Sequence, residues 1–275
     1  MKTAWSITFA LLIPLIVDAE DIQKFSFPPP EDMNRADVYA LKTSWTPRAV
    51  LVLCPGANGN GEGMIRQKEW QEFAREQHLG LVGLSFASDG EFLSDCGRGY
   101  YCAAKGSGQI LLDAIQKIYG HDLPLLLYGF SGGAHYTSGF VEWKPTQVIS
   151  WCTYSAGWWD TPQKASANPP GIVACGDADP RYGATMIYFK QGRAVGKPWL
   201  WISLPNIGHA SSPPLEEFIR QYFTAVLKQS HTKGLWIDVD LETSASEVLQ
   251  KEQPSLTGWL PDAELFDSWK AINKP

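Results

Sequence analysis

The sequence predicts an α/β fold with a mostly parallel, doubly wound sheet and helices on both faces. Short apolar strands alternate with amphipathic helices from about residue 36 to residue 229, which implies crossover connections between parallel strands. The chain has 275 residues, 44% of them hydrophobic, and can bury one sizeable core. The formal net charge of -6 gives no support to nucleic-acid binding, which usually requires a basic surface.

The expected strands are short and apolar, and the expected helices have apolar residues at helical spacing, as at Ile110, Ala114 and Ile118. The strands cover residues 36–41, 49–54, 79–86, 123–128, 147–154, 171–175 and 199–204. The helices cover residues 62–78, 103–119, 134–142, 181–194 and 214–229. A final segment, residues 231–275, differs in composition, and we expect an extension packed on a main domain of residues 20–230.

The first residues have the pattern of a secretory signal. Lys2 provides a positive charge, residues 7–17 are almost wholly apolar, and Val17-Asp18-Ala19 resembles a cleavage site between small residues. We expect residues 1–19 to be a signal peptide and the protein to be secreted or periplasmic. A spanning helix usually needs about 20 apolar residues, so no stable membrane anchor is expected. The alternatives to export are an uncleaved anchor and a protein retained in a lumenal compartment.

Cysteine positions agree with export. Cys96 and Cys102 bracket a short glycine-containing loop, where we expect a disulfide in an oxidising compartment. Cys54, Cys152 and Cys175 lie in or at the end of predicted buried strands, where cysteine usually behaves as a small hydrophobic residue.

Neither a metal nor another cofactor is expected. The sequence has no Cys-x-x-Cys or His-x-x-x-His pattern that would suggest metal ligands. The glycine-rich segment 55–61 follows a predicted strand, but the spacing of its glycines and the distance to the next strand's acidic residue do not fit a dinucleotide-binding motif.

The strand at 123–128 leads directly into Gly129-Phe130-Ser131-Gly132-Gly133, and a predicted helix follows. A serine on a sharp turn from strand to helix projects its hydroxyl out of the sheet, and the flanking glycines permit the strained backbone. This arrangement is typical of a covalent nucleophile. The alternative interpretation is a glycine-rich turn without a chemical role.

Two later loops offer partners for Ser131. Gly176-Asp177-Ala178-Asp179-Pro180 follows the strand at 171–175, and Gly208-His209 follows the strand at 199–204. The order serine, acid, histidine, each just after a strand, is typical of a catalytic triad. Either aspartate fits this pattern.

With these motifs, the chain resembles the α/β-hydrolase superfamily, specifically secreted esterases similar to polyhydroxybutyrate depolymerases, feruloyl esterases and dienelactone hydrolases. The resemblance covers roughly residues 36–229. In these families the acid often follows a strand-ending glycine by three residues and precedes a proline, and Gly176-x-x-Asp179-Pro180 matches that pattern. The resemblance therefore implies a triad of Ser131, Asp179 and His209, with Asp177 as the alternative acid. His209 would accept the serine proton, and Asp179 would orient the imidazole.

An acyl-transfer reaction also needs donors for the developing oxyanion. The backbone N–H of Gly132, directly after the nucleophile, is the first expected donor, and position assigns the second to Ala57 in the loop after the strand at 49–54. Related enzymes usually begin this loop with His-Gly. This chain has Pro55-Gly56, a departure that leaves the backbone donor in place.

The substrate is less well defined by sequence. Trp158 and Trp159 follow the strand at 147–154, where loops line the pocket in such folds, and we expect one of them to stack on an aromatic or sugar ring; packing of the loop is the alternative. Residues 161–170 are too short for a full helical lid, which favours an open cleft.

These observations predict a secreted serine esterase that cleaves a small-molecule or polymeric carboxylic ester through an acyl-enzyme. One alternative is a serine peptidase of the same superfamily, which usually carries a gating domain or large lid. The other is a catalytically silent binding protein with a hydrolase fold, against which an intact triad argues.

Overall fold

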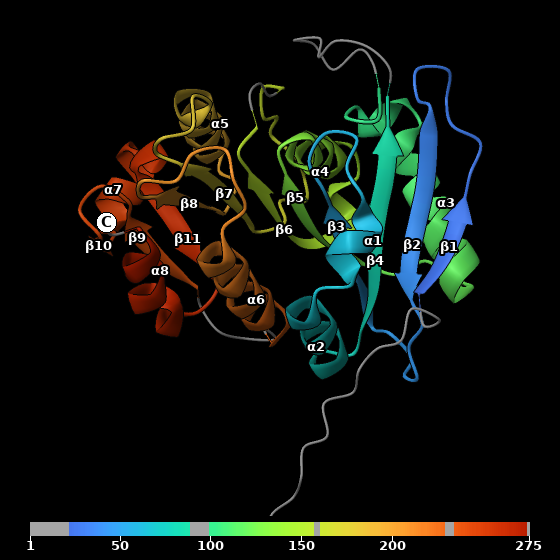
Figure 1. The fold of residues 1–275 in the computed structure, drawn as a ribbon. Coiled ribbons are helices and arrows are strands. Elements are labelled where there is room, and N and C mark those ends of the chain that lie inside the picture. Colours follow the sequence, from blue (N-terminus) through green and yellow to red (C-terminus); the bar gives the residue numbers. More distant parts are fainter. Residues whose placement is uncertain (1–21, 89–98, 157–159, 229–233, 274–275) are drawn as a thin grey trace, which may run out of the picture.

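The computed structural model describes residues 22–88, 99–156, 160–228 and 234–273. Its main feature is an eight-stranded sheet in the order β1-β2-β4-β3-β5-β6-β7-β8 (Figure 1). The strands are β1 (Ile22–Ser26), β2 (Arg35–Leu41), β3 (Ala49–Cys54), β4 (Leu79–Ala87), β5 (Leu125–Phe130), β6 (Val148–Tyr154), β7 (Gly171–Gly176) and β8 (Trp199–Leu204). β1 and β2 are antiparallel to their neighbours, and the remaining six strands, in the order β4-β3-β5-β6-β7-β8, pair in parallel.

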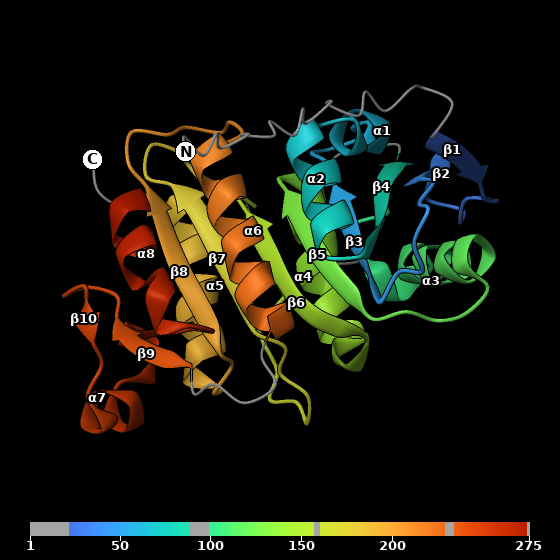
Figure 2. The ribbon, with the colours of Figure 1, turned by 90° about the horizontal axis from the view of Figure 1, so that it is seen from below.

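Helices cover both faces of this sheet, so that it lies between two hydrophobic cores (Figures 1 and 2). One face carries α3 (Ser107–Tyr119), α4 (Gly132–Trp143) and α5 (Tyr182–Ala194). The other carries α1 (Gly61–Ile65), α2 (Lys68–Glu76) and α6 (Pro213–Lys228). Every residue of β3 and β4 is buried, because strands covered on both faces need continuous rather than alternating apolar residues.

The helix expected at residues 62–78 is two helices, α1 and α2, so the prediction of one helix is wrong. Gly61 begins α1 against β4, where a Cβ would lie 2.4 Å from the backbone of Gly83 and Leu84. The chain then turns at Gln67, which is extended (φ -68, ψ 126). This change of direction lets α2 bury Trp70 and Phe73 in the core.

The helix expected at residues 103–119 is also interrupted. A 3₁₀ turn at Ala103–Lys105 precedes Gly106, whose φ is 123. This is a backbone conformation that side chains rarely allow, so a glycine separates the turn from α3. β1 was not expected either, because this edge strand is half exposed and has no strong apolar pattern.

The C-terminal residues 234–273 pack beside β8. β9 (Leu235–Asp238), β10 (Thr243–Ser244) and β11 (Thr257–Leu260) form a small antiparallel sheet, accompanied by α7 (Glu247–Glu252) and α8 (Phe266–Ile272). The indole N–H of Trp269 donates to the carbonyl of Trp201 at 2.9 Å, and the amide of Ser203 donates to Asn273 Oδ1 at 2.7 Å. α8 is therefore tied to the backbone of β8. Within the described part of the chain, no helix is long and apolar enough to cross a membrane.

Replacing Trp269 by alanine should destabilise the whole domain, because the indole is 1% exposed and makes a buried hydrogen bond. Large-to-small changes of buried aromatic residues cost about 3–5 kcal/mol, which urea unfolding would measure. Ser268→Ala, at an exposed position of the same helix, should change the unfolding free energy by about 0.5 kcal/mol at most. Equal stability of the two variants would show that the segment does not contribute to the core.

Candidate active site

Ser131 lies on the turn between β5 and α4 with φ 53 and ψ -114, a conformation that non-glycine residues rarely adopt. The glycines around it are required by close backbone contacts. A Cβ on Gly129 would lie 2.1 Å from the carbonyl oxygen of Gly133, and one on Gly133 would lie 2.0 Å from the carbonyl oxygen of Cys54. The amide of Ser131 donates to the carbonyl of Tyr154 at 2.8 Å. These contacts hold the strained turn in place.

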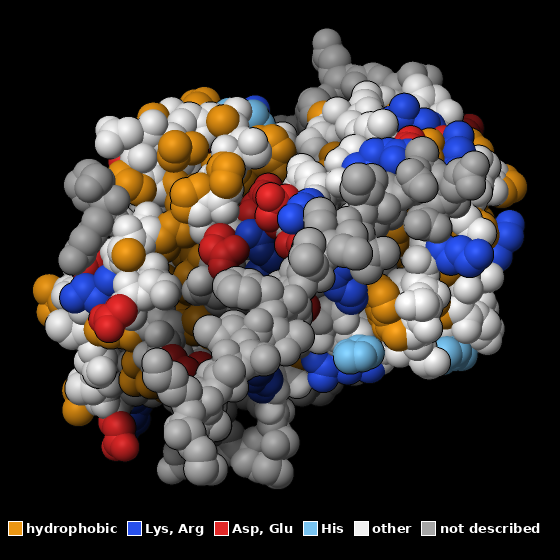
Figure 3. Space-filling model, turned by 60° about the horizontal axis from the view of Figure 1, so that its bottom comes forward, with side chains coloured by type: hydrophobic (Ala, Val, Ile, Leu, Met, Phe, Trp, Pro, Cys, Tyr) orange, Lys and Arg blue, Asp and Glu red, His pale blue; other side chains and the backbone are white. Residues whose placement is uncertain are grey.

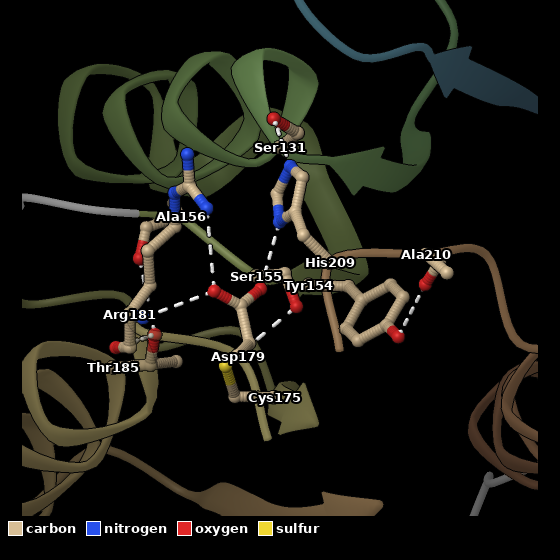
Figure 4. Close-up of polar contacts among 10 residues, drawn as sticks. All are labelled: Ser131, Tyr154, Ser155, Ala156, Cys175, Asp179, Arg181, Thr185, His209 and Ala210. Carbon is tan, nitrogen blue, oxygen red and sulfur yellow. Dashed lines mark hydrogen bonds and ion pairs between the residues drawn. The ribbon is translucent and has the colours of Figure 1, made fainter. Parts of the chain in front are cut away.

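The structure brings Ser131, His209 and Asp179 into one hydrogen-bonded series (Figure 4). His209 Nε2 lies 2.9 Å from Ser131 Oγ, and His209 Nδ1 lies 2.7 Å from Asp179 Oδ2. The three side chains come from the loops after β5, β8 and β7. An imidazole that donates from Nδ1 to the carboxylate leaves Nε2 free to accept the serine proton.

The alternative acid, Asp177, faces another direction. It is exposed, and its Oδ1 accepts a hydrogen bond from the amide of Asn206 at 2.7 Å. It therefore stabilises the neighbouring turn, as aspartate often does, whereas the carboxylate that bonds His209 is that of Asp179.

Asp179 is held by its neighbour Arg181. The side chain of Asp179 is 0% exposed, and its Oδ1 accepts hydrogen bonds from the Arg181 amide at 2.9 Å and from Arg181 Nη1 at 3.3 Å. Burial alone would raise the pKa of this carboxyl. The hydrogen bonds from Arg181 and His209 outweigh that effect and hold the pKa below its ordinary value of 3.8. Asp179 is therefore a buried carboxylate that carries its charge near neutral pH.

Two aromatic residues position His209. The ring of Phe130 stacks on the imidazole with 5.0 Å between centroids, and the hydroxyl of Tyr154 donates to the carbonyl of Ala210 at 2.6 Å. Sequence reasoning missed both residues and Arg181. Phe130 occupies a variable position of the serine motif, and nothing local in the sequence marks Tyr154 as facing the histidine loop.

The two expected oxyanion donors lie next to each other. A Cβ on Gly132 would lie 2.8 Å from the backbone nitrogen of Ala57, so both amides belong to the same small region beside Ser131. Gly56 adjoins it too, because a Cβ there would lie 3.6 Å from Ser131 Cβ. As the first residue of α4, Gly132 has an amide without a partner inside the helix. The structure therefore places the backbone nitrogen of Ala57 next to Gly132, the residue that follows Ser131.

Some sequence predictions fall outside the described residues. These include the signal peptide at residues 1–19, the predicted substrate contacts Trp158 and Trp159, and Cys96 of the predicted disulfide with Cys102. Cys54, Cys152 and Cys175 are buried free thiols. The described residues contain no cluster of three or more histidine, cysteine or acidic side chains that could hold a metal ion.

A hollow of about 420 Å³ lies between α2 and α6 and is lined mainly by charged residues (Figure 3). Glu69, Glu72 and Glu76 of α2 face Glu217 and Arg220 of α6 across it. None of the triad residues lines this hollow. Ser131, Asp179 and His209 lie instead at the edge of the sheet where β5, β7 and β8 end.

Comparison with solved structures identifies the fold. The chain is similar to FphF, a fluorophosphonate-binding serine hydrolase of Staphylococcus aureus, with a TM-score of 0.54 over 76% of this chain and 98% of that one at 13% identity. An acetyl xylan esterase from Aspergillus awamori gives a TM-score of 0.54 over 72% and 97% of the two chains at 12% identity. A hyperthermophilic esterase from Pyrobaculum calidifontis gives 0.57 over 75% and 85% at 9% identity.

The chain has the α/β-hydrolase fold. The predicted fold class is thus confirmed, with the serine turn after β5 and the acid and histidine loops after β7 and β8. No protein-family model matches the chain, and no curated protein sequence matches it. At identities this low, the α/β-hydrolase fold is what the similarity establishes.

Replacing each candidate acid by asparagine separates their roles. Asp179→Asn should lower kcat for the ester hydrolysis that the sequence predicts by about three to four orders of magnitude, because a neutral amide neither stabilises the imidazolium nor enforces the tautomer. Asp177→Asn should change kcat by about threefold at most, because it alters a turn. Steady-state kinetics on short-chain p-nitrophenyl esters measures both. A greater loss at Asp177 would reverse the assignment.

Proposed function

We propose that this protein is a serine hydrolase that cleaves carboxylic esters through an acyl-enzyme. The observation that carries the proposal is the hydrogen-bonded series Asp179–His209–Ser131. The backbone nitrogen of Ala57 lies next to Gly132, the residue after the serine, which supports the two expected oxyanion donors. Structural neighbours named as serine hydrolases and esterases support the same reaction class.

The reaction begins with attack of Ser131 Oγ on the ester carbonyl while His209 Nε2 takes the hydroxyl proton. The carbonyl oxygen becomes negatively charged in the tetrahedral intermediate, where the amides of Ala57 and Gly132 donate to it. Each such donor is worth about 2.7–4 kcal/mol of transition-state stabilisation. Asp179 stabilises the imidazolium during this step.

The intermediate collapses when the bond to the alcohol oxygen breaks and His209 returns its proton to the departing alcohol. The acyl group is then bound to Ser131 as an ester. Water attacks this acyl-enzyme, again with His209 as the base, and releases the carboxylic acid and the free serine. The same groups therefore serve both halves of the reaction, and no cofactor is needed.

Amide hydrolysis by the same triad is the second candidate. A neighbour named poly(aspartic acid) hydrolase-1 from Sphingomonas sp. KT-1 has a TM-score of 0.54 over 76% of this chain. A catalytically inactive binding protein is less favoured, because Ser131, His209 and Asp179 are within hydrogen-bonding distance of one another in series and Asp179 retains its charge.

For the substrate, we favour a bulky ester, whether aromatic, sugar-linked or polymeric, over a small buried metabolite. Residues 160–170 connect to β7 without a helix, so no helical lid forms from this segment. An open approach to Ser131 accommodates large substrates, and stacking on Trp158 or Trp159 is part of the same proposal.

Replacing Ser131 by alanine should abolish ester hydrolysis and labelling by a fluorophosphonate probe, since both need the activated hydroxyl. Losing a triad nucleophile typically lowers kcat by about six orders of magnitude. Hydrolysis of p-nitrophenyl esters and intact mass after labelling are the measurements. Unchanged hydrolysis by Ser131→Ala, or a wild-type protein that neither turns over esters nor takes up the probe, would reject the proposal.

We also propose that the protein is exported. Lys2, the apolar residues 7–17 and the small residues before Glu20 support this. When the full chain is expressed in a host with its secretion machinery, the product outside the cytoplasm should begin at Glu20, as N-terminal sequencing would show. Retention of an intact Met1 terminus in the cytoplasm would contradict export.

A further inference from the structure

The loop that contains Ala57, residues 55–61, depends on hydrogen bonds from other parts of the chain for a fixed conformation. Its first two residues, Pro55 and Gly56, have no side-chain hydrogen-bond donor. The loop turns sharply, with the amide of Gly59 donating to the carbonyl of Gly56 at 2.9 Å and with Asn58 at φ 54. An oxyanion donor is effective only if it is fixed before the reaction begins. The neighbours of this loop therefore matter for the Ala57 amide.

Arg35, on β2, binds this loop from the side. Its Nη2 donates to the carbonyls of Asn58 at 2.7 Å and Gly59 at 2.9 Å. Its Nε donates to the carbonyl of Ser85 on β4 at 3.0 Å. A single planar guanidinium thus connects two consecutive carbonyls of the loop to the sheet, a geometry that the fork of arginine allows and a lysine ammonium does not.

Neutral hydrogen bonds complete the attachment to β4. Ser85 Oγ accepts from the amide of Gly61 at 2.8 Å and donates to Asn60 Oδ1 at 3.2 Å. The side chain of Asn58 accepts from the amide of Ser88 at 3.1 Å and donates to its carbonyl at 3.3 Å. The charged contacts of Arg35 are the stronger type, because ionised donors form hydrogen bonds roughly twice as strong as neutral ones.

We propose that Arg35 is a positioning residue of the oxyanion hole, which rests on the proposed hydrolase function. It fixes the carbonyls of Asn58 and Gly59. Because Ala57 directly precedes Asn58, this also holds the Ala57 amide toward the space beside Ser131. Arg35 touches no reacting atom. Its loss frees the loop, and the Ala57 amide then stabilises the tetrahedral intermediate less than in the wild type, while binding of the ester changes little.

This role predicts a specific kinetic pattern. A donor that acts mainly in the transition state affects kcat, whereas uniform substrate binding affects KM. For Arg35→Met, which keeps an aliphatic stem, kcat should fall about 10-fold to 100-fold, as small misplacements of reacting groups do. KM should change by about twofold at most. Arg35→Lys should fall between wild type and Arg35→Met, because it keeps the charge without the fork.

Arg48 supplies the matched control. Its Nε also donates to a backbone carbonyl, that of Gln77, at 2.9 Å, and its Nη2 donates to Gln77 Oε1 at 3.1 Å. It precedes β3, at the end of the strand opposite the loop. Arg48→Met removes a comparable surface contact and should leave kcat unchanged.

The experiment measures kinetics on p-nitrophenyl esters, with fluorophosphonate titration to count intact sites, and amide hydrogen exchange of a peptide spanning residues 55–61. Lower kcat and faster exchange of this peptide in Arg35→Met, with neither change in Arg48→Met, support the proposal. Wild-type kcat or wild-type exchange in Arg35→Met overturns it, as do equal effects in both variants. A wild-type protein that neither hydrolyses esters nor takes up the probe would instead refute the hydrolase function. The exchange measurement still tests the Arg35 proposal in that case, because unchanged exchange of residues 55–61 in Arg35→Met would show that Arg35 does not hold the loop.

Discussion

The geometry of the candidate site depends on direct backbone contact between the start of α4 and the end of β3. Gly133 lies so close to the carbonyl of Cys54 that even a methyl group would collide with it. This contact lets the helix begin directly above the sheet, right after Ser131 with its positive φ. It also brings Gly132 to the loop that contains Ala57. A side chain at position 133 would displace the helix, the serine and one proposed donor together.

The parallel strands supply the other half of this arrangement. β5, β6, β7 and β8 are consecutive neighbours in the sheet, so the loops that follow them meet at one edge. The acid loop and the histidine loop can then reach Ser131 without long insertions. Arg181 keeps Asp179 ionised although the carboxylate is buried. Packing thus positions the side chains, and local hydrogen bonds determine the charge of the acid.

The features that could be predicted from the sequence are those with a local signal in it. The apolar runs marked the central strands, the glycines marked the serine turn, and the chain order marked His209. The choice between Asp177 and Asp179 needed a resemblance, because two residues on one loop have the same local pattern. The break at Gln67, the stacking of Phe130 and the contacts of Arg35 depend on elements far apart in the chain. No pattern within a short window contains that information.

The buried cysteines have a consequence for how the protein is handled. Burial raises the pKa of the thiols of Cys54, Cys152 and Cys175, and none of them is more than 1% exposed. Since the thiolate is the reactive species, the folded protein protects these groups from oxidants and alkylating reagents. The unfolded chain exposes all of them at once. Oxidising conditions therefore threaten the yield of folding rather than the lifetime of the folded protein.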